Sequence, residues 1–296
     1  MLRLALLLVL LLSSVVGLAV QQERESSLRR AQGSELVYLP PSWLARHLTF
    51  GHRYLVADYA WLQALQYYGN EWNRLYFYRD LARYLDLATD IDPGFGYAYR
   101  FGAAAVPFNS GGWTWHNVPQ SNELIEKGLR QDPTDWQLWL QLGFNRGVIG
   151  TDYEGAAEAY RNAARSPGSP PWIPTLVTRL YATAGSMDRA RMYAQQILAS
   201  TEEPELRETM ERRLWEIDLE EELVKIDEAL RRYRADHGED PAQVNVLVSR
   251  GYLKELPEDP FGGVFYIENG EARSSSLHKG RLRVHEEEAE REKHQQ

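Results

Sequence analysis

Three Asp-Pro or Ser-Pro pairs in this sequence follow helical patterns and recur at similar spacings. The stretches ATDIDPGF, GLRQDPTD and AARSPGSP place prolines at positions 93, 133 and 167, which are 40 and 34 residues apart. Proline ends a helix because its ring clashes with the preceding turn and because it lacks a backbone N–H. A period of this length is typical of proteins that stack one supersecondary unit many times. Repetition therefore constrains the fold more than any single motif does.

The clearest repeat unit lies between the second and third of these prolines. It reads WLQLGFNRGVIGTDYEGAAEAYRNAARSP and runs from Trp139 to Pro167. Leu142 and Gly143 lie in a first helix, which Gly150 ends. A second helix follows, with its inward residues three or four positions apart at Tyr153, Ala156, Tyr160 and Ala163. Large side chains fill the space between two helices and small ones allow close approach, so the unit predicts a helical hairpin.

This unit resembles the tetratricopeptide repeat (TPR), which has the same W-x2-LG opening, glycine turn, second helix and closing proline. It differs by one extra residue, Thr151, before the second helix. The next unit, WIPTLVTRLYATAGSMDRARMYAQQIL, has matching residues at Tyr181, Gly185, Met187 and Ala190. Two upstream units match in YRDLARYLDLATDIDP and SNELIEKGLRQDP, and contain the insertions NEWNRLYF and VPFNSGGWTWHNVPQ. The resemblance implies about four repeats over residues 53–200, in a TPR-like helical-hairpin solenoid assigned to residues 41–203.

Helical patterns also extend beyond these units. Apolar residues three or four apart predict a helix from Leu44 to Tyr68, which Gly69 ends. From there to about residue 236 the sequence shows no useful strand-like alternation. A long amphipathic helix is predicted over residues 204–238, with acidic residues at its start and arginines near its end, as the helix dipole favours. So long a helix needs a packing partner along its length, so its second half must belong to a further unit.

Residues 239–281 predict that further unit, a small α+β hairpin module. A short helix is expected with Asp240 as its cap and Pro241 in its first turn. A hairpin follows, with a first strand over Val264–Ile267, a tight turn at Asn269–Gly270 and a return strand. Together with the repeats, the module predicts a chain that is mainly α-helical.

The module resembles the carboxyl-terminal region of the type II secretion major pseudopilin, in which an H-G-x-x-P helix end precedes a DP(F/W)G turn and a small hairpin. The matching residues are His237, Gly238, Pro241, Leu253, Pro257, Asp259, Pro260, Phe261 and Gly262. The prepilin peptidase signature is missing, and SSSLHKGRLRV offers no carboxylates in place of the pseudopilin's calcium loop. The resemblance implies a shared fold and a link to secretion or pilus-type machinery. The two departures argue against a subunit that polymerises in a pseudopilus.

The first 20 residues, MLRLALLLVLLLSSVVGLAV, predict a membrane segment. As a helix, the apolar run from Leu4 to Val20 would span about 25 Å, slightly less than the ~30 Å hydrocarbon core of a bilayer. An uncleaved anchor and a cleaved signal peptide both remain open, because Gly17–Ala19 resembles a cleavage site. We favour an inner-membrane anchor at residues 1–20, a linker at 21–40 and a periplasmic body. Residues 282–296 are highly charged and predict a disordered tail.

Composition and motifs argue against several functions. The formal charge of -9 disfavours nucleic acid as a partner, because phosphate binding needs clustered Lys and Arg. The chain has no cysteine, which excludes disulfides, thiol catalysis and cysteine-ligated zinc. It has no HExxH, GxSxG, P-loop or dinucleotide motif, and its seven His residues show no ligand spacing. We therefore expect no catalytic residue, no cofactor and no metal site.

The insertion PFNSGGWTWHNVP is the best candidate for a binding surface. It contains Trp113, Trp115 and His116, and exposed aromatic residues on a loop often mark a contact surface. The alternative is that both tryptophans pack over the neighbouring hairpin. In tetratricopeptide proteins the first helices build the concave face, so the resemblance implies further protein-binding residues at Gln137, Phe144, Thr175 and Arg179.

These features favour a membrane-tethered scaffold or adaptor that binds another protein in the cell envelope. Stacked hairpins present an extended surface for a peptide or a helix, and they need no catalytic residue. The alternative is a structural or assembly subunit that is held permanently in a large membrane protein complex. An enzyme would require an unrecognised constellation around His116 or Arg179.

Overall fold

The computed structural model describes residues 39–276 except residues 48 and 113. The chain divides into two compact units, residues 1–52 and residues 53–296, and each is described by itself. Within its described residues the first unit holds the short helix α2 (Ser42–His47).

Several sequence predictions fall outside the described residues. These are the membrane segment at residues 1–20, most of the linker at 21–40, and the tail at 282–296. In the part of the chain that the structure describes, no helix is both long enough and apolar enough to cross a membrane.

The described residues are mainly helical, as the sequence predicts, and they also form two small antiparallel sheets. The helices of the second unit are α3 (Arg53–Tyr68), α4 (Glu71–Leu75), α5 (Leu81–Ile91), α6 (Gly96–Ala105), α7 (Val118–Gln131), α8 (Trp136–Phe144), α9 (Tyr153–Arg165), α10 (Ile173–Thr183), α11 (Met187–Ser200), α12 (Pro204–His237) and α13 (Asn245–Ser249). One sheet pairs β1 (Phe108–Asn109) with β2 (Trp115–His116), and the other pairs β3 (Phe265–Glu268) with β4 (Glu271–Ser274).

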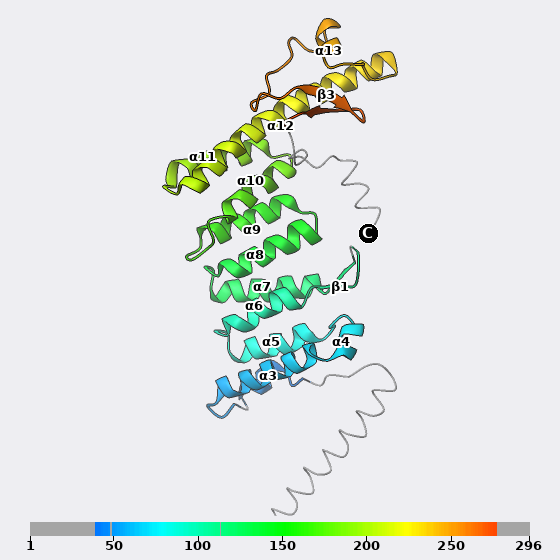
Figure 1. Cartoon of the computed structure of the whole chain (residues 1–296). Coiled ribbons are helices and arrows are strands. Elements are labelled where there is room, and N and C mark those ends of the chain that lie inside the picture. The colour runs from blue at the N-terminus through cyan, green and yellow to red at the C-terminus, as the bar shows by residue number, and fades with distance from the viewer. Residues whose placement is uncertain (1–38, 48, 113, 277–296) are drawn as a thin grey trace, which may run out of the picture. The chain divides into compact units, whose positions relative to one another are not determined.

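The helices of the second unit pack on their neighbours in chain order, as Figure 1 shows. Four pairs make extensive contacts: α3 with α5, α6 with α7, α8 with α9, and α10 with α11. Each pair also contacts the next, through α5 and α6, α7 and α8, α9 and α10, and α11 and α12. The apolar face that one hairpin leaves uncovered is thus buried by the hairpin that follows it.

Close approach of the helices depends on glycine at three helical positions. A Cβ atom at Gly143 of α8 would overlap the ring of Tyr160 in α9. A Cβ atom at Gly128 of α7 would lie 2.6 Å from Leu138 Cδ1 of α8. Gly102 of α6 is equally confined, because a Cβ atom there would overlap the side chain of Leu124 in α7. Large side chains therefore pack directly on backbone, both within hairpins and between them.

The link between α8 and α9 contains a local irregularity. Residues Asn145–Ile149 form a single π-helical turn, and Thr151 then adopts a positive φ of 55°. Such turns widen an α-helix locally. Thr151 lies between this turn and α9, which Asp152 begins by accepting a hydrogen bond from the backbone N–H of Gly155 (2.9 Å).

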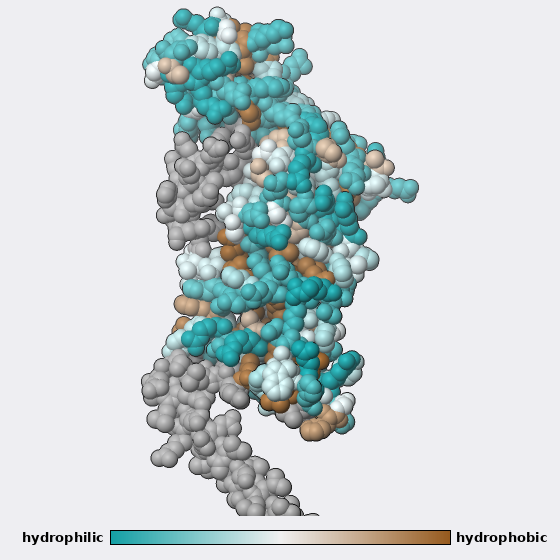
Figure 2. All heavy atoms as spheres, turned by 180° about the vertical axis from the view of Figure 1, so that it is seen from behind, coloured by the Kyte–Doolittle hydropathy of each residue, from teal (hydrophilic) through white to brown (hydrophobic). Residues whose placement is uncertain are grey.

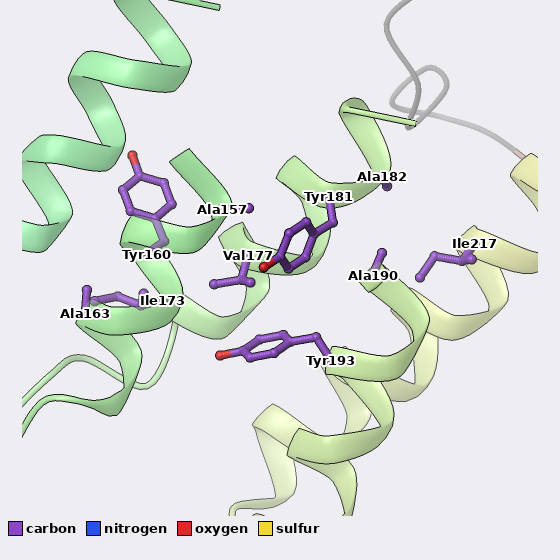
Figure 3. Packing of buried hydrophobic residues seen from close by; sticks show 10 residues of the cluster. All are labelled: Ala157, Tyr160, Ala163, Ile173, Val177, Tyr181, Ala182, Ala190, Tyr193 and Ile217. Carbon is purple, nitrogen blue, oxygen red and sulfur yellow. The ribbon is translucent and has the colours of Figure 1, made fainter. Parts of the chain in front are cut away.

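The core of the last two hairpins contains three tyrosine rings, Tyr160, Tyr181 and Tyr193, from α9, α10 and α11. In Figure 3 the rings of Tyr181 and Tyr193 point to the same side, whereas the Tyr160 ring points away from them. The Tyr181 hydroxyl donates a hydrogen bond to Glu158 Oε1 (2.7 Å), and the Arg189 guanidinium lies 4.6 Å from the centre of the Tyr181 ring. Arg189 also forms an ion pair with Glu158. This polar network therefore joins three consecutive helices at the edge of the apolar core.

The longest helix, α12, has a different packing partner for each half. Its first part packs on α11, and near the middle of α12 Arg191 of α11 forms ion pairs with Asp218 (2.5 Å) and Glu221 (2.9 Å). Its second half contributes to a separate buried cluster, which consists of Leu219, Leu223, Ile226, Ala229, Leu230, Tyr233, Val244, Leu247, Phe265 and Ala272. Gly238 ends the helix with a φ of 77°, a conformation that glycine adopts without strain.

The Asp-Pro-Phe-Gly turn is fixed to the return strand of the hairpin by Asp259. Its carboxylate accepts hydrogen bonds from the hydroxyls of Ser274 and Ser276 and from the backbone N–H of Phe261 (2.7 Å). Burial opposes ionisation of Asp259, but these hydrogen bonds prevail and lower the pKa of its carboxyl. The turn and the serine string therefore form one structural unit.

The prediction of one helix from Leu44 to Tyr68 is wrong in one respect, because the structure has two helices there, α2 and α3. Phe50 and Gly51 have positive φ values of 47° and 89°, which a helix does not allow, and they separate α2 from α3. Apolar periodicity continues through this break, so the sequence pattern did not reveal it. The two-residue strands β1 and β2 were also missed, because they are too short to show alternation.

The start of the last short helix is also wrong in the sequence prediction. The helix α13 begins at Asn245 and not near Pro241. Asp240, which was expected to cap it, accepts a hydrogen bond from Arg234 Nε at 2.7 Å instead. The first strand of the hairpin, β3, begins one residue later than expected.

The contact between Gly143 and Tyr160 predicts a specific sensitivity to added volume. We expect Gly143→Ala to destabilise the chain by about 1–3 kcal/mol, because the new methyl group overpacks the interface. Gly96→Ala in α6 is the matched control and should change stability by less than about 0.5 kcal/mol, since its nearest neighbour is the flexible side chain of Arg100. Urea unfolding measures both, and equal stability of the two variants would contradict the packing described.

The Tyr181 network predicts a pH-dependent stability. Burial, and then the hydrogen bond and charge of Glu158, raise the pKa of Tyr181 to about 12, whereas an unfolded tyrosine titrates near 10. The stabilisation is therefore complete below pH 10 and is lost as the pH rises towards 12. We expect Tyr181→Phe to cost about 1–2 kcal/mol at pH 8 and progressively less above pH 10. Tyr266→Phe, at a ring that is 43% exposed, is the control. A cost for Tyr181→Phe that does not change with pH would contradict this account.

Candidate protein-binding surface

The insertion between α6 and α7 is an ordered hairpin. β1 and β2 pair in the register Phe108 with His116 and Asn109 with Trp115. The side chain of Asn109 holds the loop, because Oδ1 accepts from the Gly111 N–H (2.7 Å) and Nδ2 donates to the Gly112 carbonyl (3.0 Å). Both glycines have positive φ, which suits a tight loop.

This hairpin is attached to the turn that follows α4. The ring of His116 stacks on that of Phe77, with a centroid distance of 3.9 Å and an interplanar angle of 2°. Asn117 Nδ2 donates to the Phe77 carbonyl (2.5 Å), and His116 Nε2 lies 3.0 Å from Ser110 Oγ. Two insertions that lie about 40 positions apart in the sequence, one in each of the first two hairpins, therefore form one surface.

The turn after α4 adopts an uncommon backbone conformation. Phe77 and Tyr78 are consecutive non-glycine residues with positive φ values of 57° and 52°. Each such residue costs about 1–2 kcal/mol and persists only where its surroundings hold it. Here the Tyr78 N–H donates to the Asn73 carbonyl (2.9 Å), and the Tyr78 ring packs edge-on against Phe108. Burial raises the pKa of the Tyr78 hydroxyl. Strained, supported turns of this kind are frequent at binding sites.

A cleft of about 650 Å³ lies where the two insertions meet. Its lining residues are Glu71, Arg74, Leu75, Phe77, Phe108, Asn109 and Ser110. Aromatic rings and an exposed leucine supply an apolar surface, while Arg74 and Glu71 add one charge of each sign. This combination suits an apolar side chain of a partner that is flanked by polar or charged groups.

The structure brings together two of the residues that the sequence singled out. Trp115 is partly buried, and its ring makes an edge-on contact with Phe144 of α8 at a centroid distance of 6.1 Å. For Trp115 the structure therefore favours the alternative that the tryptophans pack on the neighbouring hairpin. Trp113 lies outside the described residues.

Two ring contacts have been described, His116 on Phe77 and Trp115 on Phe144. The three remaining predicted contact residues take part in neither. Gln137 is exposed in the first turn of α8, and Arg179 is exposed on α10. Thr175 is partly buried, and its hydroxyl donates to the Trp172 carbonyl at 2.6 Å. Gln137 and Arg179 thus remain accessible to a partner, whereas the Thr175 hydroxyl is satisfied by the residue that precedes its helix.

Sequence reasoning missed Arg74, Phe77 and Phe108. The first two lie in the insertion NEWNRLYF, whose aromatic residues were a visible signal. Their position beside His116 depends on tertiary packing, which periodicity does not report. Within residues 39–276, apart from 48 and 113, no group of three or more His, Asp or Glu residues could hold a metal ion.

No protein-family model matches this sequence, and no curated protein matches it. Its function is therefore inferred from the residues described above.

The left-handed conformation of Asn117 (φ 61°) predicts an order of stability among its variants. Asn117→Gly should cost about 1 kcal/mol, because the hydrogen bond to the Phe77 carbonyl is lost while the conformation stays accessible. Asn117→Ala should cost a further 1–2 kcal/mol or so, because a Cβ atom without a local hydrogen bond disfavours positive φ. Urea unfolding of the two variants tests this order, and equal costs would show that the conformation is not required.

Proposed function

We propose that this chain is a membrane-tethered TPR-like adaptor that binds another protein in the cell envelope, without catalysis. Residues 4–20 anchor it in the inner membrane, and its body lies on the periplasmic side. The observation that carries the proposal is the cleft between the two insertions, where paired strands and the stack of His116 on Phe77 form a fixed apolar surface. A preformed surface of this kind lowers the entropic cost of binding.

The packing of the helices supports the TPR-like part of the proposal. The LG glycine of the clearest unit, Gly143, faces Tyr160 of the second helix, as the resemblance requires for close approach. Hairpins that pack in chain order suit an extended binding surface, to which Gln137 and Arg179 contribute exposed polar groups.

The chemistry of the cleft suggests the kind of partner. Phe77 and Phe108 would receive an apolar anchor residue, and Arg74 would pair with a carboxylate beside it. The pseudopilin-like module at the end of α12 suggests, by resemblance alone, that the partner belongs to secretion or pilus-type machinery.

A second candidate is a structural subunit held permanently in a membrane complex. The specific observation in its favour is the number of exposed large hydrophobic side chains close to the amino end of the second unit, such as Leu55 and Leu75, at 69% and 65% exposure. Permanent partners normally cover such residues.

Affinity purification from detergent-solubilised membranes tests the proposal with a pair of variants. Arg74→Glu reverses the charge at the cleft, and Arg231→Glu reverses an exposed charge on α12. We expect Arg74→Glu to reduce recovery of the main co-purified protein about tenfold and Arg231→Glu to leave it unchanged.

The salt dependence of the same experiment separates the two candidates. An adaptor should release its partner as the salt concentration rises, because the charge of Arg74 is exposed. A stoichiometric complex that resists salt would favour the permanent subunit. Equal recovery with both variants would contradict binding at the cleft.

A further inference from the structure

Helix α3 has apolar side chains on two faces. Its inner face packs on α5 through Ala57, Ala60 and Ala64, which are all buried. Leu55, Tyr59 and Leu62 occupy the opposite face, where they are 69%, 63% and 53% exposed. Their spacing of four and three residues aligns them in one stripe along the helix. A helix that is apolar on two faces is normally covered on both.

Exposed apolar residues are concentrated at this end of the second unit. Among its described residues, nine exposed large hydrophobic side chains lie between positions 54 and 97, and seven are spread over positions 148–266. Figure 2 shows brown and pale residues among the hydrophilic ones at the lower right, at the end of the unit that α3 occupies in Figure 1. Exposed apolar side chains gathered at one end of a structure often mark a site of interaction with a partner or a membrane.

The residue types of this face suit the interfacial region of a bilayer. Tyrosine is enriched where membrane meets water, since its ring is apolar and its hydroxyl is polar, and leucine adds buried apolar area. The only charged residues of α3 are Arg53 and Asp58, which have opposite signs. The helix therefore has no net charge to attract anionic lipid, and the exposed Asp58 lies beside the stripe, one turn from Leu55 and Leu62.

Along the sequence, α3 lies closer to the proposed membrane segment than any other helix of the second unit does. Only 32 residues separate Val20, the end of the apolar segment, from Arg53, the first residue of α3. An anchored chain holds α3 at a high local concentration of lipid, so that even a weak interfacial contact is occupied.

We propose that the stripe of Leu55, Tyr59 and Leu62 on α3 lies in the headgroup region of the membrane to which the chain is tethered. This inference rests on the proposed anchor at residues 4–20. The contact would fix the orientation of the first hairpin against the bilayer. A second copy of the chain and a separate membrane protein are the other possible occupants of this face.

The absence of cysteine makes a direct test possible, because a single introduced cysteine is the only labelling site. Tyr59→Cys places an environment-sensitive fluorophore on the stripe. Met192→Cys on α11 is the matched control, since its side chain is also exposed, at 69%. Each full-length labelled chain is reconstituted into phosphatidylcholine vesicles with and without lipid that has a nitroxide quencher near its headgroup.

We expect the fluorophore at position 59 to shift its emission to the blue and to lose intensity with the quencher lipid, whereas the fluorophore at 192 should do neither. Adding Leu62→Asp should weaken the quenching at position 59, because a charge then opposes insertion. Emission at 59 that is as water-like as at 192 would overturn the proposal. A blue shift without lipid quenching would overturn it as well and would indicate a protein occupant.

Flotation of the vesicles after a high-salt, alkaline wash separates failure of the docking from failure of the tether. A chain that floats with the vesicles but is unquenched at position 59 is anchored and not docked. A chain that is washed off the vesicles has no anchor, which contradicts the proposed function and the docking that rests on it.

Discussion

Glycine at position 143 lets the ring of Tyr160 pack directly on the backbone of α8, and the remaining stack depends on contacts of this kind. Gly128 gives Leu138 the same access between successive hairpins. Because the side chains interlock at short range, each hairpin fixes the position of the next with little freedom to slide. The Tyr181 network adds polar contacts that join α9, α10 and α11 at the edge of the same core.

The candidate binding surface follows from this close packing. The first two hairpins hold their insertions side by side, so that the ring of His116 reaches Phe77 and the side chain of Asn117 bonds to its carbonyl. The cleft therefore belongs to no single hairpin and is formed by the contact between two of them. Helices supply the rigidity of such a surface, and insertions supply its chemistry.

The sequence predicts features that depend on neighbouring residues. The long helix predicted over residues 204–238 does end at Gly238, because a left-handed helix end is a local property. Contacts between distant segments were not predictable in the same way. The apolar pattern continues through the break at Phe50, and nothing in the local sequence indicates that Phe77 meets His116. Asp240 was expected at the start of a helix, but it bonds to Arg234 in the last turn of α12, and α13 begins only at Asn245.

The central claim is that a partner protein binds where the two insertions meet. Hydrogen exchange of the full chain, with and without the partner recovered from membranes, measures this most directly. The account predicts slower exchange in the backbone of residues 71–78 and 108–117, where the cleft is formed, and little change in α9 and α11. Slower exchange confined to β3 and β4, or in no part of the second unit, would contradict it.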